Sequence, residues 1–195
     1  MAQHEDAELV PSPTFDADKN RELENCRLEV GRALKMMEKG RRLDAQEILE
    51  SSIEKLETLG VTMDYLRAMS FLADLMDDMD YSETAAEKRY ECIELAASKF
   101  GEKSHLRATL MVKQVATLFR LLDRNEDKNK IRKYSEETSR MSVETLKVLN
   151  KVEDYPKKEE IIKDLQEKIT FCELIIENVR TLSAMIKMPR KGAKK

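Results

Sequence analysis

The stretch ADLMDDMD at residues 73–80 decides the fold of this chain, because related stretches stand on either side of it. The sequence ALKMMEKG occupies residues 33–40, and ATLFRLLD occupies residues 116–123. Each stretch begins with Ala, carries a large apolar residue three places later and has a candidate turn residue seven places after the Ala. The offsets between the three alanines are 40 and 43 residues. A period of this length is typical of repeats that consist of two helices.

Glycine residues mark the same period independently. Gly60 ends the sequence TLG and Gly101 ends KFG, and these two glycines are 41 residues apart. Apolar residues at three- and four-residue spacing precede each of them, as expected for amphipathic helices that stop at a Gly. We therefore predict an all-α fold, an α-solenoid of about three antiparallel helix hairpins followed by a long C-terminal capping helix.

Small residues support the hairpin interpretation, because a small side chain lets two helices pack about 8–10 Å apart. Ala45 stands at the small position of the second helix in the first hairpin. In the second hairpin Thr84 or Ala85 fits that position with a one-residue slip, and in the third hairpin Lys128 stands there. The third hairpin is therefore divergent. The main apolar anchors of its second helix are Ile131, Tyr134, Met141 and Val148.

The composition limits the classes of function. Charged residues make up 37% of the 195 residues and hydrophobic residues 41%, which favours one soluble domain over a membrane span. The formal net charge is −3, so the chain as a whole exerts no general attraction on nucleic acid or an anionic membrane. The three cysteines are far apart and no basic-then-apolar leader precedes them, which favours a cytoplasmic protein.

The chain divides into four segments by its sequence pattern. Residues 1–19 have two prolines, an acidic bias and no hydrophobic periodicity, so we predict a disordered N-terminal tail. Residues 20–153 hold the helical repeats, residues 154–187 form a capping or coiled-coil helix, and residues 188–195 form a basic tail. A broad apolar stripe favours docking of the C-terminal helix on the preceding hairpin, and a dimeric coiled coil is the alternative. The stripe includes Ile162, Leu165, Ile169, Cys172, Ile176, Val179 and Ile186.

The sequences LADLMDDMDYSETAAEKRY and FGEKSHLRATLMVKQVATLF resemble tetratricopeptide repeats (TPR), in the roughly 42-residue form found in kinesin light chains. In that form a conserved segment joins successive hairpins, and it is matched here at Phe100, Gly101, Ala108 and Thr109. The His-Pro pair of that segment is Ser104-His105 in this chain, so the proline is missing. The resemblance covers about residues 25–150 and implies a TPR-like solenoid with a concave surface for a peptide or a partner helix.

Aligning the three alanines places a set of first-helix residues along that surface. The predicted groove is mixed in charge but partly cationic, and it consists of Arg27, Val30, Leu34, Arg67, Ser70, Asp74, Lys113, Thr117 and Arg120. The asparagines with which chaperone-binding members of the family hold a C-terminal carboxylate are absent from these positions. The resemblance therefore implies an acidic or tryptophan-acidic peptide, as kinesin light chains recognise.

Searches of the sequence for catalytic and metal-binding motifs find none. His105 lies in a turn that recurs for architectural reasons, without the Ser, Cys or carboxylate pattern of a catalytic site. The acidic run around residues 74–80 lacks the central Gly and terminal Glu of a calcium loop. We interpret Asp74, Asp77, Asp78 and Asp80 as a helix end facing water, and the three cysteines as partly buried apolar residues. We predict no catalytic residue, no metal site and no cofactor.

These observations favour a non-catalytic adaptor or scaffold that binds a peptide or helix of a partner protein. The alternative is a structural subunit of a larger cytoskeletal or ciliary assembly, docked through its outer faces and its C-terminal helix. For the adaptor we expect a cytoplasmic monomer with a protein partner and no nucleic-acid or membrane partner. Dimerisation through the C-terminal helix is the alternative oligomeric state.

Overall fold

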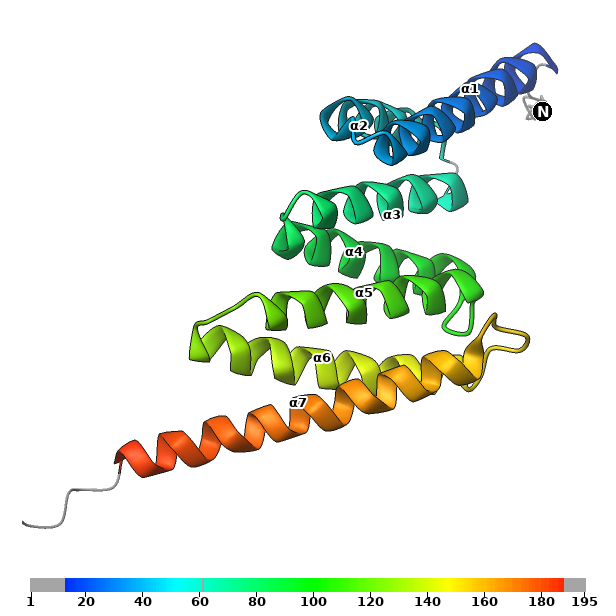
Figure 1. The fold of residues 1–195 in the computed structure, drawn as a ribbon. Helices are drawn as coiled ribbons and strands as arrows, with labels where there is room; N and C mark the ends of the chain where they lie inside the picture. Colours follow the sequence, from blue (N-terminus) through cyan, green and yellow to red (C-terminus); the bar gives the residue numbers. More distant parts are fainter. Residues whose placement is uncertain (1–12, 61, 188–195) are drawn as a thin grey trace, which may run out of the picture. The chain divides into compact units, whose positions relative to one another are not determined.

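The computed structural model describes residues 13–60 and 62–187, and this part of the chain forms seven α-helices and no strand (Figure 1). The helices are α1 (Pro13–Glu38), α2 (Arg42–Leu59), α3 (Thr62–Asp78), α4 (Ser82–Phe100), α5 (His105–Asp123), α6 (Lys128–Leu149) and α7 (Lys158–Lys187). The predicted all-α repeat is confirmed, because three helix pairs joined by short turns precede a single long helix. The chain forms two compact units, and the boundary between them in the sequence falls after Phe71, inside α3. We call these unit 1 and unit 2.

Helix α1 begins earlier than the sequence pattern predicted. Its first residue is Pro13, whereas we expected fixed structure from about residue 20. Pro suits the first turn of a helix, because its φ is already helical and the N–H that it lacks would have no partner there. The sequence reading took this proline as a sign of disorder, although it is equally a helix-start signal. The predictions for residues 1–12 and 188–195 lie outside the described residues.

The turns after α1 and α3 have the same hydrogen-bonded geometry. Gly40 and Asp80 both adopt a left-handed conformation, with φ of 73° and 67°. The backbone N–H of the following residue, Arg41 or Tyr81, donates to the carbonyl five positions earlier at 2.9 and 2.8 Å. This is the Schellman motif that commonly ends helices. It explains why a turn residue recurs seven places after Ala in the first two repeats.

The turn between α5 and α6 departs from this pattern. Helix α5 ends at Asp123, and Arg124 after it is right-handed with φ of −86°. Asp127 caps α6 by accepting a hydrogen bond from the backbone N–H of Asn129 at 2.7 Å. Asp123 is therefore not a left-handed turn residue, and the prediction for it was wrong. Lys128 is the first residue of α6 and does not occupy a small packing position between helices.

Most of the small residues that mark the repeat are fully buried. Ala33 and Ala45 have no exposed surface in unit 1, and Ala73 and Ala85 have none in unit 2. The close approach of helices at these positions is therefore as predicted. Ala116 of α5 is partly exposed, whereas the residues on either side of it are buried. Ala116 is therefore less closely packed than the other four alanines.

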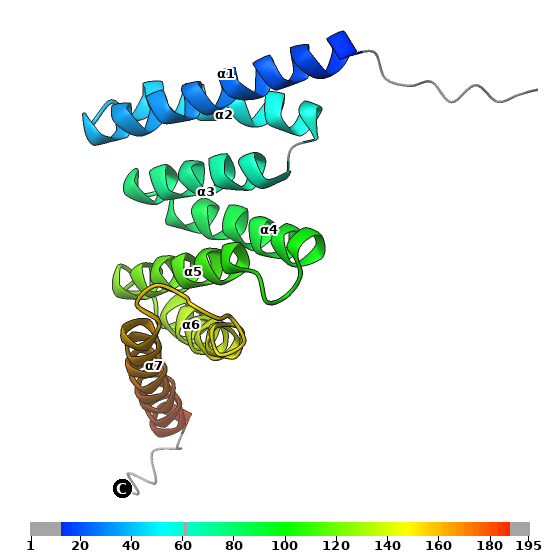
Figure 2. The same cartoon turned by 90° about the vertical axis from the view of Figure 1, so that its right-hand side faces the viewer.

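In unit 2, α6 packs against both α5 and α7 (Figure 2). Four of its fully buried residues are small and carry hydroxyl groups: Ser135, Thr138, Ser142 and Thr145. Of the four predicted anchors of α6, Tyr134, Met141 and Val148 are buried and Ile131 is partly exposed. Leu165 and Cys172 of α7 are fully buried, so the C-terminal helix covers the last hairpin as predicted.

Candidate functional site

In unit 1, the predicted groove residues of α1 and α3 meet at one carboxylate. Arg27 of α1 donates to both carboxylate oxygens of Asp64 in α3, from Nε at 3.3 Å and from Nη2 at 3.0 Å. Its third contact is with Glu24, at 2.7 Å from Nη1. These hydrogen bonds, first of all the one to Asp64, raise the pKa of Arg27. Arg67 of α3 lies 4.0 Å from Asp64 on the same helix.

A shallow hollow of about 90 Å³ adjoins these charges. Besides Arg27, Asp64 and Arg67, it is lined by the apolar side chains of Val30, Leu56 and Phe71. The side chains of the two arginines are 48% and 62% exposed, so both guanidinium groups remain accessible to a partner. The hollow therefore combines accessible positive charge with an apolar wall.

Two other predicted groove residues of this region do not line the hollow. Leu34 of α1 is only partly exposed, and Ser70 of α3 is buried. A buried Ser offers a partner no surface, so we remove Ser70 from the proposed binding set.

In unit 2, the acidic residues at the end of α3 form ion pairs with basic side chains of α4 and α5. Asp74 accepts a hydrogen bond from Lys113 of α5 at 2.6 Å and forms an ion pair with Arg89 of α4. Asp77 lies 2.9 Å from Nη2 of Arg120 and 3.7 Å from Nη1 of Arg89. The predicted groove residues Asp74, Lys113 and Arg120 are therefore close neighbours.

The centre of this network is buried. Asp77 and Arg89 each have 1% of their side-chain surface exposed, and Thr117 has none. Thr117 donates to Asp77 at 2.9 Å and accepts from Arg89, while Ser82 donates to Asp77 at 2.6 Å. Buried charges are tolerated when they are paired and hydrogen-bonded in this way. The prediction that the acidic run faces water was wrong for Asp77, and Thr117 lies beneath the surface rather than on it.

Arg89 is the residue that sequence reasoning missed. It stands between Ala85 and Cys92, at the three- to four-residue spacing of the buried face of α4. A charged residue at a core position of an amphipathic helix signals a buried ion pair, because such a charge must find a partner. The acidic pair Asp74 and Asp77, three residues apart on α3, supplies that partner.

His105 and the three cysteines, the residue types that could carry catalysis, are held in packing contacts or buried. His105 is the first residue of α5 and stacks on the ring of Tyr155 with centroids 5.6 Å apart. Cys26, Cys92 and Cys172 are buried free thiols. Burial raises the pKa of Cys92 and of Cys172 to about 11, which disfavours the reactive thiolate.

The structure gives two further observations on sites and spans. Within residues 13–60 and 62–187, no group of three or more His, Cys, Asp or Glu side chains is arranged to hold a metal ion. None of the described helices has the length and apolar character needed to cross a membrane.

Comparison with known proteins gives a likeness to solved structures alone. No family model matches the chain, and no curated protein matches it. Among solved structures, the chain is similar to the crystal structure of BtubC (BKLC) from P. vanneervenii, with 15% sequence identity and a TM-score of 0.48. The alignment covers 87% of this chain and 69% of that one.

Proposed function

We propose that the chain is a non-catalytic protein-interaction adaptor that binds a peptide or helix of a partner through its first-helix surface. We define this surface separately in each unit, as Arg27, Val30 and Arg67 in unit 1 and as Asp74, Lys113 and Arg120 in unit 2. One observation carries the proposal: in each unit, charged side chains of successive first helices pair with one another, α1 with α3 and α3 with α5. Adjacent first helices that share a charged surface are what a TPR-like groove requires.

The chemistry of the surface favours an acidic partner. Arg27, Arg67 and Arg120 keep substantial solvent exposure although a carboxylate lies beside each of them. A guanidinium group can hold two carboxylates at once, because it presents five N–H donors in a planar fork. In unit 1 the hollow beside Val30, Leu56 and Phe71 would take an apolar side chain of the same partner. The resemblance to kinesin light chains noted in the sequence is in agreement with an acidic peptide ligand.

A charge reversal at Arg67 tests this proposal. Arg67 is the most exposed cation of the surface, and its nearest carboxylate is 4.0 Å away, so Arg67→Glu should leave the fold intact. We expect the full chain carrying Arg67→Glu to lose proteins that the parent retains in affinity capture with mass spectrometry. Arg140→Glu, the same change at an exposed arginine of α6, is the matched control. Retention of every partner by Arg67→Glu would contradict the proposal.

A second candidate function rests on the exposed apolar residues of α7. Leu174 is 61% exposed and Phe171 of the same helix is 48% exposed, although Phe171 also contacts Phe119. Such residues would suit a structural subunit that docks through its C-terminal helix, including in a cytoskeletal or ciliary assembly. This function predicts that Leu174→Asp removes the captured partners and that Arg67→Glu does not.

A further inference from the structure

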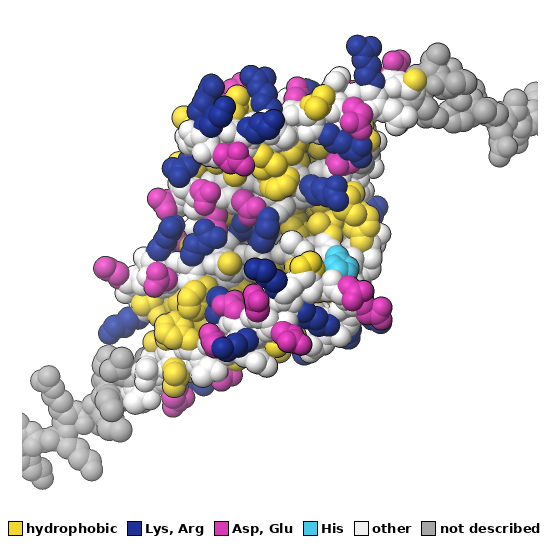
Figure 3. All heavy atoms as spheres, turned by 45° about the vertical axis from the view of Figure 1, so that its right-hand side comes forward, with side chains coloured by type: hydrophobic (Ala, Val, Ile, Leu, Met, Phe, Trp, Pro, Cys, Tyr) yellow, Lys and Arg dark blue, Asp and Glu magenta, His cyan; other side chains and the backbone are white. Residues whose placement is uncertain are grey.

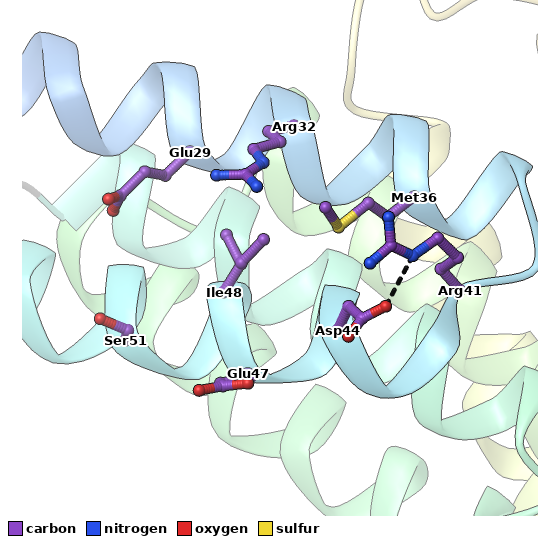
Figure 4. A pocket seen from close by; sticks show the side chains of 8 residues that line it. All are labelled: Glu29, Arg32, Met36, Arg41, Asp44, Glu47, Ile48 and Ser51. Atoms are coloured by element: carbon purple, nitrogen blue, oxygen red, sulfur yellow. Dashed lines mark hydrogen bonds and ion pairs between the residues drawn. The ribbon is translucent and has the colours of Figure 1, made fainter.

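The first hairpin contains a cleft between α1 and α2 that is separate from the first-helix surface (Figure 4). Its volume is about 340 Å³, and its lining includes Glu29, Arg32 and Met36 from α1 and Asp44, Glu47 and Ile48 from α2. Figure 4 shows Arg32 and Ile48 facing each other across the cleft, with Glu29 on one side and Met36 on the other. The cleft therefore places a guanidinium group beside an apolar patch.

Two of the carboxylates at this cleft already have partners. Glu29 accepts from Nζ of Lys55 at 3.1 Å, and that contact raises the pKa of Lys55. Asp44 accepts from Nε of Arg41 at 2.7 Å. Arg32 is exposed, and none of the residues described in the structure pairs with it. The positive charge of Arg32 is therefore available to a ligand.

Further basic residues surround Arg32. Lys35 lies three residues after it on the same face of α1, and Lys39 lies seven residues after it, one position beyond the end of the helix. Residues 32–44 hold five basic and two acidic residues, in a chain whose net charge is −3. Figure 3 shows Lys and Arg side chains gathered over the α1/α2 hairpin. Residues 32–44, around the turn between α1 and α2, are therefore a local basic segment of a chain whose net charge is negative.

We propose that the α1/α2 cleft binds an acidic segment of a partner protein that also carries a large apolar side chain. A carboxylate of the segment pairs with Arg32, further carboxylates reach Lys35 and Lys39, and the apolar side chain packs on Met36 and Ile48. Charge complementarity selects the acidic segment, since Arg32, Lys35 and Lys39 have no partner among the described residues and the apolar floor adds contact area.

A protein segment suits this cleft better than a nucleic acid or an anionic membrane. Glu47 and the paired carboxylates of Glu29 and Asp44 line the same cleft, and they would repel a uniformly anionic polymer or surface. A peptide can alternate carboxylates with apolar side chains to match such a mixed lining. The site is also independent of the first-helix surface, because Arg27 and Val30 lie roughly 140–160° around α1 from Arg32.

Fluorescence anisotropy with the full chain and a labelled synthetic peptide tests the proposal. The probe is a short amphipathic peptide of Glu, Leu and Ala, and its counterpart with Gln in place of Glu controls for charge. We expect the Glu peptide to bind at low ionic strength and Arg32→Glu to weaken binding about tenfold or more. Glu47→Arg should strengthen binding, which a misfolded variant could not do. Arg140→Glu should bind as the parent chain does.

Each remaining outcome overturns the proposal. No binding of the Glu peptide, or equal binding of the Gln peptide, would show that the basic region does not select an acidic segment. Equal losses of peptide binding for Arg32→Glu and Arg140→Glu would show that only the net charge of the chain matters, and not the position of Arg32. A loss with Arg67→Glu alone would assign the peptide to the first-helix surface. If duplex DNA or phosphatidylserine vesicles bound in an Arg32-dependent way and the peptide did not, the partner would be a nucleic acid or an anionic membrane and not a protein segment.

Discussion

The two ends of helix α3 place the same residue type in different electrostatic surroundings. Near its start, Asp64 pairs with Arg27 and Arg67, whose guanidinium groups are largely exposed. Near its end, Asp77 pairs with the partly exposed Arg120, and also with the buried Arg89 and the buried hydroxyl of Thr117. The comparison shows that the buried cation, which is present only at the second end, separates the two roles. An exposed partner leaves a charged surface for binding, whereas a buried partner ties the helices together.

Loss of the buried cation should have the largest effect. Arg89→Ala removes the buried cation and leaves Asp77 with Arg120 as its ion-pair partner, so we expect the free energy of unfolding to fall by about 3 kcal/mol. Denaturant unfolding followed by circular dichroism measures this. The double substitution Arg89→Met with Asp77→Leu should recover part of the loss, because it removes both charges together. A loss below about 1 kcal/mol for Arg89→Ala would break the comparison, since it would make this pair no more important than an exposed one.

A substitution that disturbs packing at α3 should cause the next largest loss in the free energy of unfolding. Ala73 is fully buried in unit 2, so Ala73→Leu forces extra volume between close helices and should cost about 1–3 kcal/mol. Ala116→Leu is the matched control, because Ala116 is partly exposed and its added methyl groups can extend into solvent. Equal losses from the two substitutions in urea melts would show that exposure does not distinguish these alanines.

Two glycines of unit 1 should respond to the same change with opposite sign. Gly40 has φ of 73°, so Gly40→Ala strains the turn and should cost about 1 kcal/mol. Gly31 lies inside α1 and a Cβ there would meet no atom within 4 Å, so Gly31→Ala should add up to about 1 kcal/mol. Thermal melts of the two variants test this. If the thermal midpoints of both variants moved in the same direction, the left-handed turn assigned to Gly40 would be contradicted.

Removal of the exposed cation should have the smallest effect on stability. Arg27→Ala breaks the pair with Asp64, but the arginine side chain is half exposed and water can replace its contacts. We expect the thermal midpoint to stay within the error of the measurement at physiological salt. A clear loss of stability, of the kind expected for Arg89→Ala, would erase the distinction between the two ends of α3.

The periodic parts of the structure could be predicted from the sequence. The alanines at 40-residue spacing indicated close helix contacts, and Ala33 and Ala73 are fully buried as expected. The third repeat was misjudged at Asp123. The turn between α5 and α6 contains one residue more than the turns between α1 and α2 and between α3 and α4. It uses Asp127 as a cap in place of a left-handed residue.

The pairing of charges could be predicted only in part. The alanine register identified Arg27, Arg67 and Lys113 as first-helix residues, but the sequence does not say which carboxylate each one meets. Those contacts depend on rotation of one helix against the next, as in the pairing of Arg27 with Asp64, 37 residues away. The burial of Thr117 was missed for the same reason, since one helical position separates a surface residue from a buried one.

Hydrogen exchange on the full chain, with and without a partner recovered by affinity capture, tests the proposed function most directly. If the first-helix surface is the binding site, partner binding should slow exchange in α1 and α3 around Arg27 and Arg67 and in α5 around Lys113. Exchange in α7 should not change. Protection confined to α7, with α1, α3 and α5 unaltered, would contradict the adaptor function and favour the structural subunit.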